Sequence, residues 1–338
     1  MELTRKTLLV TLEFPPQIGG VSSYYWQLCQ RFSADKIFVL TEKIPHRSIV
    51  PDVNFKIVRT NMLVRCCYPH WLSLIWKIFK MARREKIEQL WLGQVLPVGT
   101  AGLIAAKILH LPYITSTHGL DIMLPQTNWH KKILLKIILN QASIITANSQ
   151  YTRKKLLKLG VPDKKIEVIY PEAKIKDKAD QQTVELIINK HQLTGKKIIL
   201  TVARLVERKG HNLVLHALAE LKNIDQVVYI IVGNGPYQEQ LVSLTEKLGL
   251  QKKVIFTGFV SEDELAAFYQ LCNVFVLTPQ ETPTDAEGFG IVYKEVQNFS
   301  KPIIARDTGG VGEALKNYQN KQFVNDVISL TQALNKFL

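Results

Sequence analysis

Two acidic residues, Glu287 and Glu295, bracket a short glycine-containing segment that begins with Gly288 and Phe289. Glycine lets a backbone approach a ligand closely, and the N–H groups at the start of a helix bind phosphate. If the stretch from Phe289 onward is helical, the two carboxylates lie roughly 12 Å apart along its axis. Carboxylates accept hydrogen bonds from sugar hydroxyls, so one could hold a sugar ring and the other a ribose. The segment therefore predicts a site for a sugar nucleotide.

The same two residues also fit an ordinary structural role. Glu287 could cap the helix or lie in its first turn, where a carboxylate is favourable, and Glu295 could be a solvated helix residue. Other loops of the chain must decide between the two interpretations.

Two of these loops carry groups suited to a phosphate. After the first apolar run, Gly19 and Gly20 begin a helix and would expose N–H groups to an anion. After a later run come Arg204 and Lys209. Arginine grips phosphate bidentately and lysine adds a point charge, so this pair could neutralise a departing diphosphate.

Two further turns follow strand-like runs. Gly233 and Gly235 lie in a Gly-Asn-Gly-Pro sequence that fits either a nucleotide-contacting turn or a purely structural one. His118 follows the run Tyr113–Thr117 and would face a ligand at the end of that strand, although a single His-Gly turn is commonly structural.

Short apolar runs alternate with helical patterns along the whole chain. The expected strands are residues 7–12, 37–40, 89–92, 113–117, 143–147, 198–202, 227–232, 254–256, 274–277 and 302–305. The expected helices include 21–32, 71–86, 210–221, 236–248 and 325–338. This alternation predicts βαβ units, an α/β fold with parallel sheets, and ligands at the carboxyl ends of the strands.

The length of 338 residues fits two such domains, because single cores stop growing near 250–300 residues. A polar, lysine-rich stretch begins near residue 171 and reads as the connection. We expect an N-terminal Rossmann-like domain over residues 1–172, facing acceptor and membrane. A nucleotide-sugar-binding domain should occupy residues 173–338.

Composition excludes several classes of protein. The chain is 46% hydrophobic and 21% charged, and no apolar run approaches the 18 or so residues of a membrane span. The first apolar run is too short for a secretory signal, so a cytoplasmic location is expected. The four cysteines show neither a disulfide framework nor zinc-ligand spacing.

A net charge of +14 indicates an anionic partner. Basic residues gather beside apolar ones in 71–86 and 129–165, which favours docking on an anionic membrane surface; an ordinary solvated face is the alternative. Nucleic acid is disfavoured, because no stacking aromatics or recognition motif accompany the charge. Cys66 and Cys67 could be acylated.

Taken together, these motifs resemble the family-4 (group 1) retaining glycosyltransferases of the GT-B fold, in which two Rossmann-like domains face each other across a cleft. The resemblance rests on Pro15-Pro16 with Gly19-Gly20, His118-Gly119, Arg204 to Gly210, Gly233 to Pro236, Phe256 to Gly258, Glu287 with Glu295, and Gly309-Gly310 with Glu313. It implies catalytic roles for His118, Arg204, Lys209 and Glu287. The donor-binding residues that it implies are Gly19, Gly20, Gly233, Gly235, Gly288, Phe289, Gly290, Ile291, Val292 and Glu295.

The resemblance also implies a mechanism: retention of configuration through an oxocarbenium-like state, with electrostatic catalysis by protein cations and backbone dipoles. No metal and no cofactor are expected, in keeping with the lack of an Asp-x-Asp motif; the nucleotide sugar is a co-substrate. The implied activity moves a hexose from GDP-mannose or a UDP-hexose to a lipid-linked or envelope-polysaccharide acceptor, peripherally on the cytoplasmic face of a membrane.

Two other functions are compatible with parts of the sequence. After Glu313 the family's usual continuation is eroded, which favours a non-catalytic nucleotide-sugar-binding or assembly subunit as the alternative. An oxidoreductase is disfavoured, because no Gly-x-Gly-x-x-Gly follows the first strand.

Overall fold

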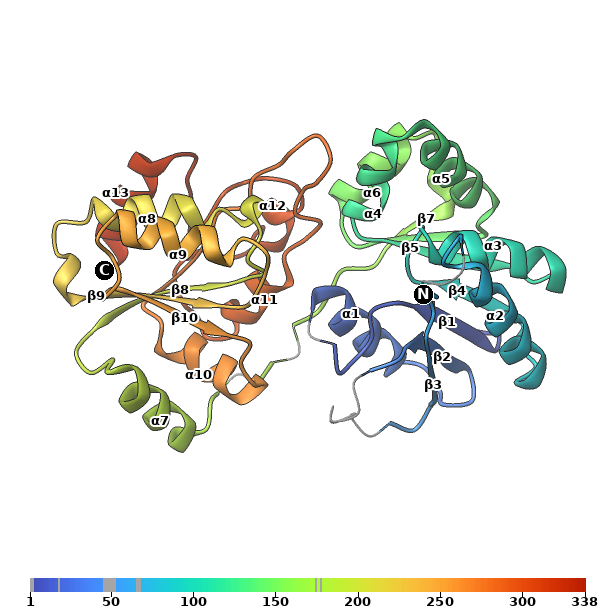
Figure 1. The fold of residues 1–338 in the computed structure, drawn as a ribbon, viewed down its shortest axis with the longest axis horizontal. Coiled ribbons are helices and arrows are strands. Elements are labelled where there is room, and N and C mark those ends of the chain that lie inside the picture. Colours follow the sequence, from blue (N-terminus) through green and yellow to red (C-terminus); the bar gives the residue numbers. More distant parts are fainter. Residues whose placement is uncertain (1–2, 18, 45–52, 65–67, 174, 177) are drawn as a thin grey trace. The chain divides into compact units, whose positions relative to one another are not determined.

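The computed structural model describes residues 3–17, 19–44, 53–64, 68–173, 175–176 and 178–338 (Figure 1). These residues pack into two compact units. The first runs to Glu172 and includes Pro283–Gly288; the second comprises Ala173–Thr282 and Phe289–Leu338. The division at residue 172 lies where the connection between domains is expected from the sequence, whereas residues 283–288 are expected in the second domain.

The first unit is built on a seven-stranded parallel sheet in the order β3-β2-β1-β4-β5-β6-β7. Its strands are β1 (Thr7–Thr11), β2 (Ile37–Glu42), β3 (Lys56–Thr60), β4 (Gln89–Leu92), β5 (Tyr113–Thr117), β6 (Ile144–Ala147) and β7 (Ile166–Val168). Its helices are α1 (Gly20–Cys29), α2 (Leu72–Arg84), α3 (Val98–Leu109), α4 (Leu120–Met123), α5 (Trp129–Gln141) and α6 (Gln150–Lys158), with 3₁₀ turns η1 (Leu124–Thr127) and η2 (Asp163–Lys165).

The second unit has a six-stranded parallel sheet in the order β10-β9-β8-β11-β12-β13. Its strands are β8 (Lys197–Val202), β9 (Val227–Val232), β10 (Val254–Gly258), β11 (Val274–Leu277), β12 (Ile303–Ala305) and β13 (Lys321–Phe323). Its helices are α7 (Gln181–His191), α8 (His211–Ala219), α9 (Gln238–Lys247), α10 (Glu262–Leu271), α11 (Ile291–Gln297), α12 (Val311–Ala314) and α13 (Val327–Phe337), with 3₁₀ turns η3 (Glu207–Lys209) and η4 (Ile224–Gln226).

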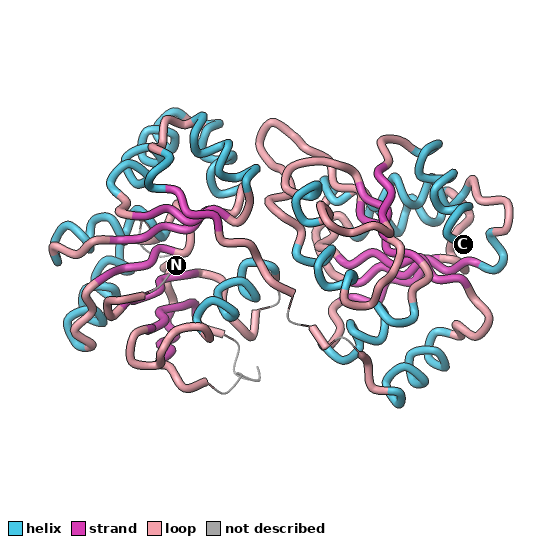
Figure 2. Tube along the Cα trace, turned by 180° about the vertical axis from the view of Figure 1, so that it is seen from behind, coloured by secondary structure: helices cyan, strands magenta, loops and turns pink. Residues whose placement is uncertain are grey.

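Both faces of each sheet are covered, which explains why the central strands are continuous apolar runs. In β1, Leu8 and Val10 pack into a core shared with α2 and α5, whereas Leu9 packs with Tyr25 of α1 on the other face. Successive side chains of a strand point to opposite faces, so the strand contributes to two cores. Figure 2 shows the strands at the centre of each unit with helices around them.

All ten strands expected from the sequence are present, and the α/β class is confirmed. Three edge strands, β3, β7 and β13, were not expected. The segment after Glu287 departs from the expectation, because its helix begins at Ile291 and not at Phe289. The axial spacing of the two carboxylates derived from a continuous helix is therefore wrong.

Within the described ranges, no helix combines the length and apolarity that crossing a bilayer requires. No group of three His, Cys, Asp or Glu side chains is placed to hold a metal ion in that part of the chain. Cys29 and Cys272 are buried free thiols, and Cys66 and Cys67 lie outside the described residues.

Candidate active site

The first unit brings His118 and the Glu287-Gly288 segment together. His118 follows β5, and Asn148, which follows β6, donates a hydrogen bond from Nδ2 to the His118 carbonyl oxygen over 3.3 Å. A Cβ atom on Gly288 would lie 2.2 Å from that same oxygen and 2.8 Å from Asn148 Nδ2. Only glycine permits this approach, so the absence of a side chain at residue 288 has a steric cause. Glu287 beside it is buried, with 8% of its surface exposed.

The His118 imidazole is held by two tyrosines of α1. The Tyr25 hydroxyl lies 2.7 Å from Nε2, and the rings of Tyr24 and Tyr25 meet the imidazole edge-on, with centroids 5.2 and 5.4 Å away. Burial lowers the pKa of His118 to about 4, so the ring is neutral at pH 7. A neutral imidazole can donate one hydrogen bond and accept another beside a sugar.

Asp121 closes the same turn. Its Oδ1 accepts the backbone N–H of His118 over 2.8 Å, while Oδ2 is buried and has no hydrogen-bond partner among the described residues. Burial, with a smaller contribution from Glu13, raises the pKa of Asp121 to about 7, so this carboxyl is partly protonated near neutral pH. Tyr25, Asp121 and Asn148 had no role assigned from the sequence.

Gly19 and Gly20 begin α1 as expected. Gly19 has an extended backbone, with φ of 164°, and no side chain caps this ten-residue helix among the described residues. The first turn contains no acidic residue that would repel an anion. The phosphate-binding role of these glycines stays a prediction.

In the second unit, Arg204 and Lys209 follow β8 at its carboxyl end. Arg204 is exposed and Lys209 lies half-buried in η3. The next residue, Gly210, has a left-handed φ of 74°, and a Cβ there would lie 2.1 Å from the carbonyl oxygen of Thr278. The loops after β8 and β11 are thus in close contact, and this contact fixes the backbone of the loop that carries Arg204 and Lys209.

Gly233 and Gly235 pack against the same loop after β8. A Cβ on Gly233 would lie 2.1 Å from the Ala203 carbonyl oxygen, and one on Gly235 would lie 2.2 Å from that of Leu205. Ala203 and Leu205 flank Arg204. These contacts show that the two glycines have a packing role on either side of Arg204. Their direct contact with a nucleotide stays a prediction.

Glu295 lies on α11, which follows the left-handed Gly290 with φ of 83°. The Tyr269 hydroxyl donates to Glu295 Oε2 over 2.8 Å. Burial raises the pKa of Glu295, and the hydrogen bond from Tyr269 partly offsets that effect by stabilising the carboxylate.

The remaining expected donor-binding residues occupy different environments. Phe289 is 3% exposed and packs in the core of the second unit, so its side chain is structural and only its backbone can serve a ligand. Ile291 and Val292 are half-buried in the first turn of α11.

The predicted residues therefore divide between the units. Gly19, Gly20, His118, Glu287 and Gly288 belong to the first, and Arg204, Lys209, Gly233, Gly235, Phe289, Gly290, Ile291, Val292 and Glu295 to the second. The residues that follow strands do so at the carboxyl end of their own sheet, where parallel α/β sheets bind ligands.

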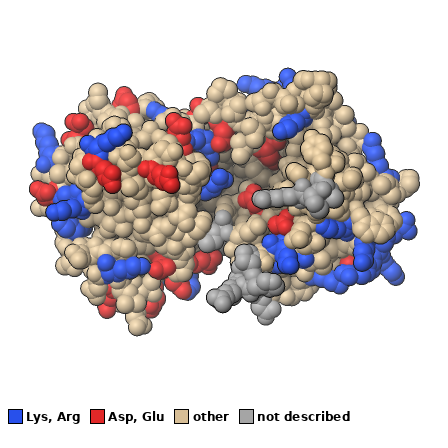
Figure 3. Space-filling view, viewed as in Figure 1, with Lys and Arg blue, Asp and Glu red and all other residues tan. Residues whose placement is uncertain are grey.

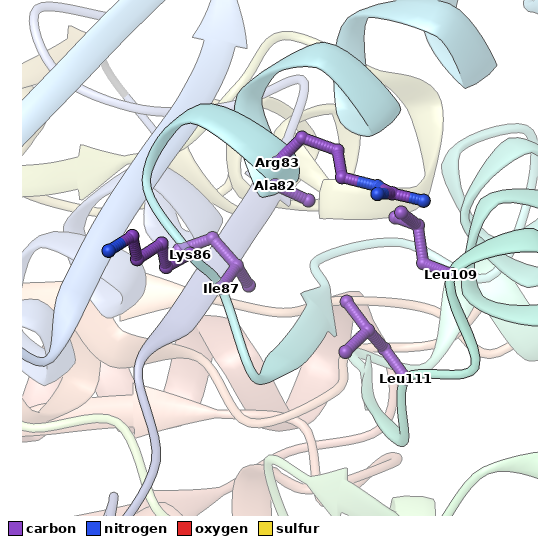
Figure 4. A pocket seen from close by; sticks show the side chains of 6 residues that line it. All are labelled: Ala82, Arg83, Lys86, Ile87, Leu109 and Leu111. Atoms are coloured by element: carbon purple, nitrogen blue, oxygen red, sulfur yellow. The ribbon is translucent and has the colours of Figure 1, made fainter.

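Two cavities of the first unit lie elsewhere. One of about 270 Å³ is lined by Ala82, Arg83, Lys86, Ile87, Leu109 and Leu111 (Figure 4). A second, of about 330 Å³, adjoins Leu111 and Tyr113. Residues 86–87 and 111 precede β4 and β5, so these cavities open at the amino ends of the strands and contain none of the predicted site residues.

Basic residues gather on the outer surface of the first unit, on the side where α2 lies (Figure 3). On α2, the buried face comprises Leu74, Ile78, Met81 and Ala82. Trp76 is 65% exposed and stacks on Phe79, over which the Arg83 guanidinium lies. Basic and aromatic side chains thus lie together on the part of α2 that faces away from the core.

Two family models match the chain: Glycosyltransferase Family 4 over residues 18–171, and Glycosyl transferases group 1 over residues 183–338. A GDP-mannose-dependent alpha-(1-6)-phosphatidylinositol monomannoside mannosyltransferase of Mycolicibacterium smegmatis is 28% identical, covering 98% of this chain and 88% of that protein. The N-acetyl-alpha-D-glucosaminyl L-malate synthase of Bacillus anthracis is 22% identical, and the match covers 89% of this chain and 79% of that protein.

Among solved structures, Anabaena HepE in complex with UDP and glucose superimposes with a TM-score of 0.80 and 20% identity. The superposition covers 98% of this chain and 89% of that one. It shows the fold, and the two parallel sheets agree with it. The chain belongs to the family-4 glycosyltransferases, which have the GT-B fold.

Proposed function

We propose that this chain is a retaining mannosyltransferase that transfers mannose from GDP-mannose to a lipid-linked acceptor at the cytoplasmic face of a membrane. The observation that carries the proposal is the contact of the Glu287-Gly288 segment with the His118 turn, in a chain of this family. It packs the backbone next to the buried residue Glu287 against the turn that carries the neutral imidazole of His118. Carboxyl groups and imidazoles both form hydrogen bonds with sugar hydroxyls.

The choice of GDP-mannose rests on the relatives. Mannosyltransferases of Mycolicibacterium smegmatis and Mycobacterium tuberculosis, 28% and 27% identical to this chain, are named as dependent on that donor. A UDP-hexose is the competing donor, since Anabaena HepE, which has a similar fold, has been solved in complex with UDP-glucose. Base and epimer selection depend on pocket shape, so the donor must be measured.

In the proposed mechanism, the bond between the anomeric carbon and the diphosphate oxygen breaks, and the acceptor oxygen bonds to the same face of that carbon. The acceptor's proton passes to the leaving diphosphate. Arg204 and Lys209 neutralise the charge that develops on the diphosphate, which stabilises the transition state more than the ground state. Glu295 holds the ribose hydroxyls, while Glu287 and His118 orient the sugar.

We further propose that the reaction needs no bound metal. Metal ions at phosphoryl groups act by charge stabilisation, and two protein cations with helix N–H groups supply the same kind of field. Turnover should therefore persist in an excess of chelator. A requirement for Mg²⁺ or Mn²⁺ would contradict this part of the proposal without affecting the choice of sugar.

The lipid-linked acceptor is supported by the exposed surface of α5, which we call the α5 face. Trp129, Ile133 and Ile137 repeat every four residues along it and are 66, 51 and 39% exposed. Lys131, Lys132 and Lys136 accompany them, and the helix has no acidic residue. Such a surface suits the headgroup region of an anionic bilayer, where each basic residue contributes about 1 kcal/mol.

The deciding experiment first screens donors by thermal shift. Purified protein is mixed with GDP-mannose, UDP-glucose, UDP-galactose or UDP-N-acetylglucosamine, since a ligand at 100 times its Kd stabilises by about 2.7 kcal/mol. Transfer to phosphatidylinositol mannoside in mixed micelles is then followed, and the anomeric configuration of the product is read by NMR.

We expect the largest shift with GDP-mannose and an α-linked mannosyl product. A larger shift with a UDP-hexose would contradict the proposal that GDP-mannose is the donor. Binding without hydrolysis or transfer for any acceptor would favour the non-catalytic subunit.

A further inference from the structure

The Tyr25 hydroxyl lies between two groups of the first unit. Its oxygen is 2.5 Å from the carbonyl oxygen of Gly93 and 2.7 Å from Nε2 of His118. Tyr25 is fully buried in α1, while Gly93 and His118 follow the neighbouring strands β4 and β5. The three groups therefore meet at the carboxyl edge of the sheet.

The positions of the hydrogens follow from the acceptor capacity of each group. A carbonyl oxygen can only accept, so at 2.5 Å the single phenolic proton must point to Gly93. The Tyr25 oxygen then faces His118 with a lone pair. Nε2 of His118 must carry a hydrogen to make the 2.7 Å contact, and in a neutral imidazole the other nitrogen, Nδ1, is left as an acceptor.

We infer that Tyr25 is a positioning residue that holds His118 in the Nε2–H tautomer, so that Nδ1 accepts a hydrogen bond from a hydroxyl of the donor sugar. This inference rests on the proposed function, because it assigns the hydroxyl to a sugar. None of the described residues hydrogen-bonds Nδ1, and the His118 side chain is only half-buried.

The surroundings keep this arrangement fixed. The Gly93 N–H donates to the Val10 carbonyl over 2.8 Å, and a Cβ on Gly93 would lie 2.7 Å from the Thr11 side chain, so the Gly93 backbone is tied to β1 and closely packed. The backbone N–H of His118 is bonded to Asp121. Tyr25 also packs edge-on against Trp91, which restricts the phenol ring.

Burial lowers the pKa of His118 more than the nearby Gly93 carbonyl raises it, so the imidazole stays neutral. The tautomer requires this, since protonation would place a hydrogen on both nitrogens. The acids that influence this cluster are Asp121 and Glu13. Asp121 is itself partly protonated near neutral pH, so its negative charge stabilises a protonated His118 ring only in part.

The first test is spectroscopic and does not depend on activity. Histidine is labelled with ¹⁵N in the full chain, and the His118 ring signals are assigned as those missing from the His118→Asn variant. At pH 7.5 we expect a protonated Nε2 and an unprotonated Nδ1. A protonated Nδ1 in the wild type would overturn the inference, whereas lack of turnover in the wild type would count against the proposed function instead.

The second test compares Tyr25→Phe with Tyr113→Phe. Tyr113 donates a buried hydrogen bond of 2.6 Å to the Ile138 carbonyl in the same unit, so its loss is a matched structural change away from His118. We expect Tyr25→Phe to mix the His118 tautomers and to lower kcat on the order of tenfold with little change in KM. Tyr113→Phe should leave both unchanged.

If Tyr25→Phe leaves the His118 ring signals of the wild type unaltered, Tyr25 does not position the ring. If this variant does not fold while Tyr113→Phe does, the wild-type ring signals still decide the tautomer.

Discussion

Tyr269 of α10 donates a hydrogen bond of 2.8 Å to Oε2 of Glu295 on α11, and this pair connects two helices of the second unit. The bond stabilises the carboxylate against the burial that raises its pKa. In the proposed role, the other oxygen, Oε1, would receive the ribose hydroxyl groups. The ribose-binding role proposed for Glu295 therefore depends on a tyrosine 26 residues earlier in the chain.

Replacing Tyr269 by Phe should raise the KM for the donor roughly tenfold, because a hydrogen bond to a charged group contributes about 1.5–3 kcal/mol. Without the phenol, the pKa of Glu295 rises further, so donor binding should be lost at a higher pH as the solution is acidified. KM measured between pH 5 and pH 8 checks this. Tyr318→Phe, which loses a bond to the Lys301 carbonyl, is the control. An acid limb that does not move in Tyr269→Phe would contradict the role.

Replacing Arg204 and Lys209 together by Ala should reduce kcat by at least a hundredfold, since charge stabilisation of a leaving group is worth several kcal/mol. Lys196 and Lys197, at the amino end of β8, offer a control that removes equal charge from the other end of the strand. Single-turnover rates at saturating donor separate chemistry from binding. Wild-type rates in the Arg204/Lys209 variant would refute the assignment.

The fold was largely readable from the sequence, because central strands of a covered parallel sheet are uninterrupted apolar runs. The three strands that were missed are all at sheet edges: β3 reads KIVRT, β7 reads IEV and β13 reads KQF. Edge strands are commonly short and carry charged residues, which discourages pairing with other chains. For the same reason they lack the uninterrupted apolar run by which a strand is recognised in a sequence.

The site was readable only in part, because its motifs are local but their partners are distant. Tyr25 and His118 are 93 residues apart, and no spacing rule connects them. The helix expected from Phe289 failed for a local reason: Gly290 adopts a left-handed conformation, which a continuous helix cannot contain. Gly290, one of the expected donor-binding residues, is thus also the residue after which the helix begins.

Replacing Gly288 by Ala should lower kcat/KM about a hundredfold, because a displacement near 1 Å at a reacting centre can cost that much. The new Cβ would lie 2.2 Å from the His118 carbonyl oxygen, which belongs to the backbone and cannot rotate away. Gly195→Ala is the control: Gly195 also lies in a loop, has a φ of 71° and no neighbour within 4 Å, so it should lose stability but keep activity. Equal activity in both variants would exclude a role for the Gly288 contact.

His211 predicts a pH dependence of stability. It is fully buried at the start of α8, and in the part of the chain that the structure describes neither ring nitrogen has a hydrogen-bond partner. Burial, with a smaller effect of Lys209, lowers its pKa to about 3. Below pH 6.5 the unfolded chain binds a proton that the folded chain does not, so stability falls as the pH is lowered.

His211→Leu removes this effect. Relative to the wild type, the variant should therefore gain about 2 kcal/mol of unfolding free energy between pH 7.5 and pH 5, at about 1.36 kcal/mol per pH unit below 6.5. Denaturant unfolding at the two pH values measures it. His216→Leu, at an exposed position of the same helix, controls for removing a histidine. A pH-independent difference for His211→Leu would show that this histidine ionises in the folded protein.

The α5 face predicts salt-dependent binding to anionic vesicles. Substituting Trp129 and Ile133 by Ser should weaken binding at all salt concentrations, because burial of apolar area is insensitive to ionic screening. Substituting Lys132 and Lys136 by Glu should abolish binding at low salt, because like charges then face the lipid phosphates. Co-sedimentation with phosphatidylglycerol-containing and pure phosphatidylcholine vesicles distinguishes the two contributions.

Lys222→Glu with Lys252→Glu makes the same change of charge at exposed positions of the second unit and should bind like the wild type. If that control pair lost binding as fully as the α5 variants, the attraction would come from net charge and not from this face.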